Sequence, residues 1–174
     1  MKSIMISIQP QWVEKILNGE KTIEIRKSMP KCQSSCKVFI YCTQGKTLVR
    51  HSGTQTKQFE LLTDQVLNGK VVAEFTLNKV DVLDYLDNGV VADYSLDLQP
   101  TCLSEYDINK YGDKKDLFAW HIDDLKIYDE FKNINDFYRV DQKFINKIKS
   151  LGIECDGKET LRTPPQSWCY VENI

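Results

Sequence analysis

The sequence predicts a single α+β domain, residues 1–174, whose strands form a strongly curved sheet or a small barrel. Two segments, 70–85 and 116–130, alternate apolar and polar residues as strands do, and each changes the parity of its apolar set part-way along. The change falls near Asn78 in the first segment and around Asp123 in the second. Such a change indicates a bulge or a sharp bend, which favours a curved sheet over a flat one.

The N-terminal region predicts a strand, a helix and a second strand in close succession. The segment "SIMISI" at 3–8 is rich in isoleucine and lacks breakers, which is typical of a buried strand. Pro10 suits the first turn of a helix, and apolar residues then recur at helical spacing as far as Leu17. Gly19 predicts the left-handed residue that ends this helix. From 21 to 26 the pattern alternates with a period of two, and a strand that follows a helix cap directly tends to be central in a small barrel.

The middle of the chain predicts one further strand and two short helices. Residues 37–43, "KVFIYCT", carry apolar groups on both faces and indicate a central strand. The segment 59–69 is expected to form a short helix ending at its glycine. Residues 104–112 predict a second helix, in which Ser104 and Asp107 have the spacing of an N-terminal capping pair.

The remaining segments complete an expected set of about six strands with flanking helices. The polar stretches 44–56 and 87–100 predict loops, and 133–152 predicts helical turns. The final segment, 164–172, begins with two prolines, which resist a central position and therefore predict an edge strand.

Composition narrows the classes of function. No apolar run is long enough to cross a membrane and the first residues lack a signal-peptide pattern, so a cytoplasmic protein without a membrane partner is expected. The six cysteines are then expected to be reduced thiols. Cys32, Cys36 and Cys42 are spaced irregularly for zinc, and neither a metal site nor a cofactor is expected.

Charge is distributed unevenly along the chain. Residues 1–57 contain ten Lys and Arg against three acids, whereas the remainder contains thirteen against twenty-two. A basic N-terminal third indicates a local face for anions such as nucleic acid. The alternative is that the charges interleave in space and cancel.

The segment "GEKTIEIR" at 19–26 concentrates charge within a strand pattern. Alternation places the isoleucines on one face and Thr22, Glu24 and Arg26 on the other. Glu24 and Arg26 could form a surface ion pair of little consequence for stability. If buried, the pair would instead direct Arg26 toward an anionic ligand, because a guanidinium group matches phosphate in two-point geometry.

These patterns together resemble the ASCH domain (activating signal cointegrator homology), a relative of the PUA fold. The resemblance implies a PUA-like compact β-barrel of about six strands with flanking helices, in a family associated with RNA. The ending 164–172 is similar to that of ASCH proteins from Gram-positive bacteria and their phages. The segments that carry the resemblance are "SIQPQWVEKILNGEKTIEIRK", "FIYCTQG", "GKVVAEFTL", "LFAWHIDDLKIY" and "PPQSWCYVE".

The most specific part of the resemblance is Gly19-x-Lys21-x-x-Glu24-x-Arg26. It implies that these charged residues line a central cleft between the barrel and the first helix. The ligand-binding residues implied by the resemblance are Gln9, Lys21, Glu24, Arg26, Tyr41, Gln166 and Ser167.

The resemblance implies an RNA- or nucleotide-binding protein whose cleft holds a nucleic-acid element or a modified base. One alternative is an enzyme acting on RNA or nucleosides, either a ribonuclease or an amidohydrolase, with Lys21 and Glu24 as catalytic residues. The acetylcytidine amidohydrolases that this motif resembles have a lysine equivalent to Lys21 but a threonine where this chain has Glu24, and that departure speaks against their chemistry here. A second alternative is a protein-interaction adaptor.

Overall fold

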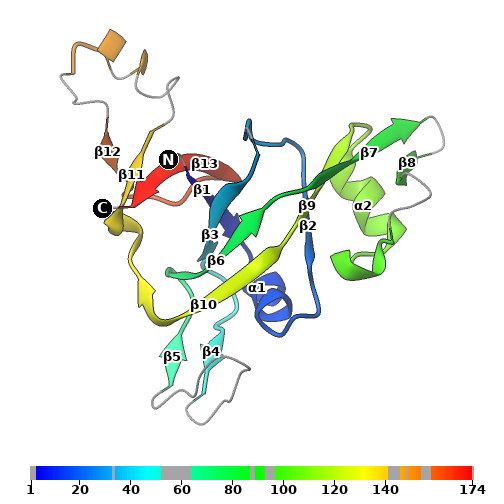
Figure 1. Cartoon of the computed structure of the whole chain (residues 1–174), viewed down its shortest axis with the longest axis horizontal. Coiled ribbons are helices and arrows are strands. Elements are labelled where there is room, and N and C mark those ends of the chain that lie inside the picture. Colours follow the sequence, from blue (N-terminus) through cyan, green and yellow to red (C-terminus); the bar gives the residue numbers. More distant parts are fainter. Residues whose placement is uncertain are drawn as a thin grey trace.

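Two β-sheets, each with one α-helix packed near it, make up the body of the molecule (Figure 1). Two long bent strands pass from one sheet into the other. The computed structural model describes residues 3–32, 34–51, 64–86, 89–92, 97–140, 146–147, 149–153 and 158–173.

The larger sheet has seven strands in the order β10-β6-β3-β1-β13-β11-β12. At its centre β1 pairs in parallel with β3 and antiparallel with β13. The bounds are β1 Ser3–Ile8, β3 Cys36–Cys42, β6 Val71–Leu77, β10 Asp123–Lys132, β11 Phe137–Arg139, β12 Glu159–Thr160 and β13 Trp168–Asn173.

The smaller sheet has four strands in the order β2-β9-β7-β8. These are β2 Ile23–Arg26, β9 Leu117–His121, β7 Val80–Leu86 and β8 Gly89–Ala92. A separate antiparallel pair, β4 Val49–Arg50 and β5 Gln65–Val66, extends away from both sheets (Figure 1). Two 3-10 turns complete the described elements, η1 Gln99–Thr101 and η2 Ile134–Asp136.

The two predicted bends are confirmed. The chain leaves the larger sheet after Leu77 and enters the smaller one at Val80. It returns between β9 and β10, where Asp124 has a positive φ of 49° and the pairing of β10 with β6 shifts register. Aspartate tolerates this left-handed conformation better than most residues, which explains how a non-glycine residue occupies the bend.

The predicted closed barrel of about six strands is wrong. Thirteen strands are present in the described part of the chain, because each bent segment contributes one strand to each sheet and several strands are very short. Among these strands the hydrogen-bonded order of each sheet ends at two separate edges, so neither sheet closes on itself. The bends transfer the chain between sheets instead of joining the edges of one sheet.

Helix α1 (Pro10–Leu17) leads directly into the charged strand. Pro10 occupies the first turn, and the apolar face packs Val13 and Ile16 into the core. The helix ends in the two-bond motif in which Gly19 N–H donates to Ile16 O (3.0 Å) and Glu20 N–H donates to Lys15 O (2.9 Å). Gly19 has φ +76°, as the sequence predicted.

Helix α2 (Glu105–Gly112) begins at the predicted cap. Asp107 N–H donates to Ser104 Oγ (3.2 Å), and Ser104 N–H donates back to the Asp107 carboxylate (3.1 Å). Ile108 is buried against the smaller sheet, in a cluster that includes Ile23 and Ile25. The isoleucines of β2 therefore anchor α2, and the alternation read from the sequence is correct for them.

Several local predictions are wrong. Strand β13 is not an edge strand, because it pairs with both β1 and β11, and its two prolines precede the hydrogen-bonded residues. Strand β2 is an edge rather than a central strand: in the described part of the chain it pairs with β9 alone. Of the helix predicted at 59–69, residues 59–63 lie outside the described residues and the remainder includes β5. Cys32 and Cys36 form a disulfide, contrary to the expectation of reduced thiols.

The left-handed conformation of Gly19, which ends α1 and leads into β2, can be tested by substitution. A Cβ atom at position 19 would meet no atom within 4 Å, so the cost of Gly19→Ala is conformational rather than steric. We expect this variant to lose about 1 to 2 kcal/mol in the free energy of unfolding, measured with urea, because alanine disfavours a positive φ. Gly19→Asn is the control and should lose less, since asparagine adopts this conformation more readily. Equal losses in the two variants would contradict the assignment.

Candidate functional site

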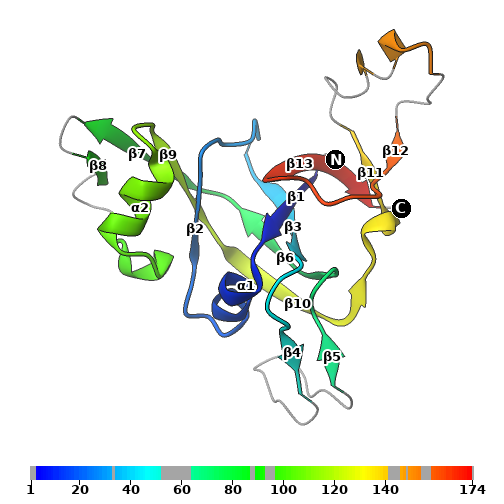
Figure 2. The same cartoon turned by 180° about the vertical axis from the view of Figure 1, so that it is seen from behind.

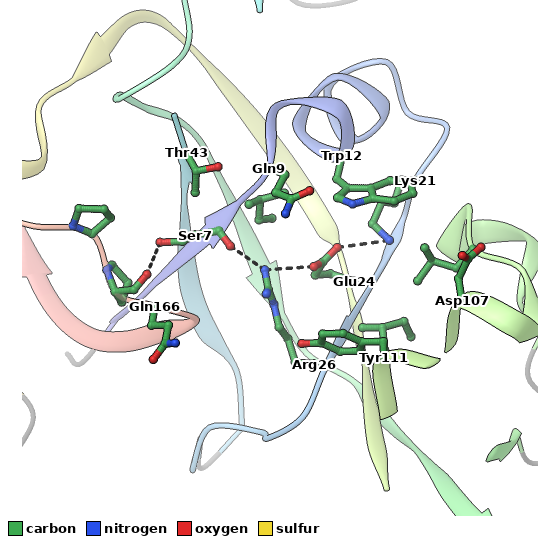
Figure 3. Close-up of a pocket in the computed structure, with 15 residues that line it drawn as sticks. Ser7, Gln9, Trp12, Lys21, Glu24, Arg26, Thr43, Asp107, Tyr111 and Gln166 are labelled. Carbon is green, nitrogen blue, oxygen red and sulfur yellow. Dashed lines mark hydrogen bonds and ion pairs between the residues drawn. The ribbon is translucent and has the colours of Figure 1, made fainter. Parts of the chain in front are cut away.

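A cavity of about 640 Å³ lies between α1, β2, α2 and the segment that precedes β13 (Figure 3). Its volume is in the usual range for sites that take small ligands. The lining residues are Ser7, Ile8, Gln9, Trp12, Lys21, Glu24, Ile25, Arg26, Thr43, Leu103, Asp107, Tyr111, Pro164, Pro165 and Gln166.

Three charged side chains from 21–26 form one buried network at this cavity. Glu24 is 7% exposed and its carboxylate lies between two cations: Oε2 is 3.2 Å from Lys21 Nζ, and Oε1 is 3.1 Å from Arg26 Nη2. Figure 3 shows the three side chains in one line. Buried charges are costly unless they are paired and hydrogen-bonded, so this carboxylate is what allows both cations to lie here.

Lys21 is the most enclosed of the three, with 2% of the residue exposed. Its ammonium group also donates to Ile23 O (2.8 Å) and Thr101 O (2.6 Å). An ammonium group has three N–H donors, and with Glu24 all three have a partner. The Trp12 ring lies over the same group, with its centroid 5.4 Å from Nζ.

Arg26 links the two sheets. Its Nη2 donates to Ser7 O (2.8 Å) on β1, while its Nε is buried without a hydrogen-bond partner among the described residues. Ser7 in turn holds the segment before β13, because its Oγ donates to Pro165 O (2.6 Å) and its N–H donates to Ser167 O (2.9 Å). The guanidinium group thus keeps donor capacity that the protein does not use.

The remaining lining residues balance the charge and add aromatic surface. Hydrogen bonds from the Ser104 side chain and backbone lower the pKa of Asp107, which keeps this carboxyl ionised. The lining therefore contains two anions and two cations, Asp107 and Glu24 against Lys21 and Arg26. Aromatic rings border it from two helices, Trp12 from α1 and Tyr111 from α2 (Figure 3).

Most of the ligand-binding residues expected from the sequence border the cavity. They are Gln9, Lys21, Glu24, Arg26 and Gln166. Tyr41 and Ser167 do not border it. Tyr41 is 5% exposed in a cluster with Met5 and Phe39, where burial raises the pKa of its hydroxyl, and Ser167 contributes a backbone carbonyl to Ser7.

Sequence reasoning missed five polar or aromatic residues of the lining, namely Ser7, Trp12, Thr43, Asp107 and Tyr111. A signal existed for two of them. Asp107 and Tyr111 are four residues apart in a predicted helix, so they share one helix face. No comparable local signal marks Thr43, which follows β3 and reaches the cavity through the tertiary fold.

The described residues contain no group of three or more His, Cys, Asp and Glu placed to hold a metal ion. In the same part of the chain, no helix has the length and apolar character needed to span a membrane.

Comparison with known proteins defines the fold. Neither a protein-family model nor a curated protein sequence matches this chain. The crystal structure of ASCH from Zymomonas mobilis superposes with a TM-score of 0.56 over 98% of this chain and 87% of that chain, at 18% identity. The chain has the ASCH fold.

Two variants of the Zymomonas protein match this chain in the same way. A variant with serine replaced by alanine gives a TM-score of 0.55 at 17% identity, over 98% of this chain and 88% of that chain. A variant with tyrosine replaced by phenylalanine gives a TM-score of 0.54 at 18% identity, over 99% of this chain and 91% of that chain. The similarity in fold thus extends over both sheets of this protein.

Glu24 is the residue whose loss tests the network. Glu24→Gln would leave Lys21 and Arg26 buried without their shared counter-ion, and we expect a loss of about 3 to 5 kcal/mol in the free energy of unfolding. Glu20→Gln is the matched control, because Glu20 forms an exposed ion pair with Lys15 at 3.0 Å and its loss should leave stability unchanged within error. Similar small losses in both variants would show that the network is open to water.

Proposed function

We propose that this protein binds RNA and takes a single base of the strand, or a free nucleoside, into the cavity. The observation that carries the proposal is a cavity of small-ligand size in which a buried, charge-balanced polar network is bordered by two aromatic rings. RNA-binding proteins commonly recognise unstacked bases by aromatic stacking together with hydrogen bonds to the base edge.

The polar groups of the lining suit a neutral heterocycle better than a phosphate group. Two cations and two anions leave no net positive charge to attract a dianion. The side-chain amides of Gln9 and Gln166 can each donate and accept, which matches base edges that carry both kinds of group. Arg26 also borders the cavity, and a guanidinium group can donate to a ring nitrogen or carbonyl oxygen of the base.

In this proposal the phosphates of a bound strand remain outside the cavity. Lys27 is exposed, follows Arg26 directly, and places Nζ 5.0 Å from the centroid of the Tyr111 ring. It therefore lies close to one lining residue and is suited to contact the backbone next to an inserted base. Lys27 would then contact the backbone at the rim, while Lys21 and Arg26 of the same basic third line the cavity.

A hydrolase has less support from this geometry. Lys21 could carry protons only after breaking one of its two hydrogen bonds or its ion pair with Glu24, and the Glu24 carboxylate is held by two cations. An adaptor that binds only proteins would not need a cavity of this size with a buried charged network in its lining. Binding without turnover is therefore the function we propose.

Tyr111 gives the sharpest test of stacking. It borders the cavity and is 37% exposed, so Tyr111→Ala should fold and weaken the affinity for nucleosides or short single-stranded RNA about 5- to 100-fold, the usual contribution of one stacked base. Tyr106→Ala is the matched control: Tyr106 is on the same helix, is 71% exposed and does not border the cavity. Titration calorimetry with a panel of nucleosides and pentanucleotides measures both.

The salt dependence of affinity in the same titrations distinguishes contacts to the base from contacts to the phosphate backbone. Nucleoside affinity should stay nearly constant between low and high salt, whereas oligonucleotide affinity should fall, because only phosphate contacts release counter-ions. Equal effects of the two tyrosine variants, or oligonucleotide binding that ignores salt, would contradict the proposal.

A further inference from the structure

We infer that Lys21 is a positioning residue, which fixes the segment 98–112 as one wall of the cavity. The inference rests on the proposed function only in that this wall faces the proposed ligand. The structural observation is that Lys21 lies where α1, β2 and η1 meet and contacts all three.

Three contacts hold η1 against the start of β2. Lys21 Nζ donates to Thr101 O at 2.6 Å, Thr22 N–H donates to Pro100 O at 3.0 Å, and Cys102 Sγ donates to Glu20 O at 3.4 Å. The first is a charge-assisted hydrogen bond between groups that are almost fully buried. It is therefore the strongest of the three contacts and the one most costly to lose.

Hydrogen bonds within the turn η1 hold its residues together, so a displacement of Thr101 would displace the whole turn. The Thr101 side chain donates to Leu98 O (2.7 Å) and accepts from Leu103 N–H (3.1 Å). Thr101 is fully buried, and the chain passes from it through Leu103 to Ser104, the cap of α2. A shift of Thr101 would therefore move the beginning of α2.

Helix α2 carries the lining residues that depend on this arrangement. Leu103, Asp107 and Tyr111 all lie within ten residues of Thr101 and border the cavity. The buried Ile108 keeps α2 attached to the smaller sheet without Lys21. Lys21 therefore fixes the position of the segment 98–112, while the apolar contacts of Ile108 keep α2 packed on the smaller sheet.

Chemical labelling of Cys102 reports the position of η1 independently of any ligand. Cys102 is a partly exposed free thiol whose Sγ faces Glu20 O, and it directly follows Thr101. In Lys21→Met we expect alkylation of Cys102 by iodoacetamide, followed by peptide mass spectrometry, to become about 10- to 100-fold faster, because a charge-assisted bond that holds the turn is lost. Nucleoside affinity should fall about tenfold in the same variant.

Matched variants separate positioning from charge balance. Lys37→Met removes an exposed lysine of β3 that pairs with Glu74 and should leave both readouts unchanged. The double variant Lys21→Met/Glu24→Gln also removes the carboxylate, which in Lys21→Met keeps only its ion pair with Arg26. If Lys21 only neutralised Glu24, the double variant would restore slow labelling; if Lys21 positions η1, labelling stays fast because the bond to Thr101 O is still missing.

The outcomes distinguish this inference from the proposed function. Unchanged labelling of Cys102 in Lys21→Met would overturn the positioning role, even with affinity lost. Absence of nucleoside binding in the unmodified protein would overturn the proposed function, while the labelling comparison would still decide the role of Lys21. If Lys21→Met does not fold, Lys21→Arg provides the same comparison. Arginine keeps the charge near Glu24 but is too large to preserve the contacts with both Ile23 O and Thr101 O. Labelling of Cys102 as slow as in the unmodified protein would then overturn the inference.

Discussion

The Glu24 carboxylate, held between Lys21 and Arg26, is the interaction on which the cavity depends. Strand β2 pairs with β9 on one side only within the described chain, and its other edge faces β1 across a gap (Figure 2). No backbone ladder closes this gap among the described strands. The side chain of Arg26 spans it instead by donating to Ser7 O, and Arg26 can stay there because Glu24 compensates its charge. The cavity is the space that this side-chain bridge leaves open.

The bent strands explain why the gap exists. If β6 and β9 had continued straight, the strands that follow them would have extended the same sheets. The bends near Asn78 and Asp124 instead turn the chain into a second sheet, which carries β2 away from β1. Polar residues at the two bends were visible in the sequence, but the direction in which each bend turns the chain depends on the partner strand, and a parity change does not specify it.

Features determined by a few neighbouring residues were predicted correctly from the sequence. Features that depend on the pairing of distant segments were not. Gly19 and the pair Ser104 and Asp107 were correct because a left-handed residue and a helix cap are local structures. Tyr41 was expected at the cavity on the assumption that β3 lies beside β2. The two strands belong to different sheets, so Tyr41 lies among buried residues instead. The central place of β13 was missed for the same reason, since strand order is a property of the whole sheet.

Glutamate at position 24 changes what the rest of the motif can do. A threonine hydroxyl at that position could not neutralise two buried cations, so Lys21 and Arg26 could not both be held as they are here. With glutamate, Lys21 gains an ion pair beside its two hydrogen bonds and is held between β2 and η1. Arg26 is fixed as well, by its contacts with Glu24 and Ser7, and it borders the cavity. In the function proposed above, Glu24 therefore favours recognition over proton transfer, because its ion pair adds to the two hydrogen bonds that hold Lys21 in place.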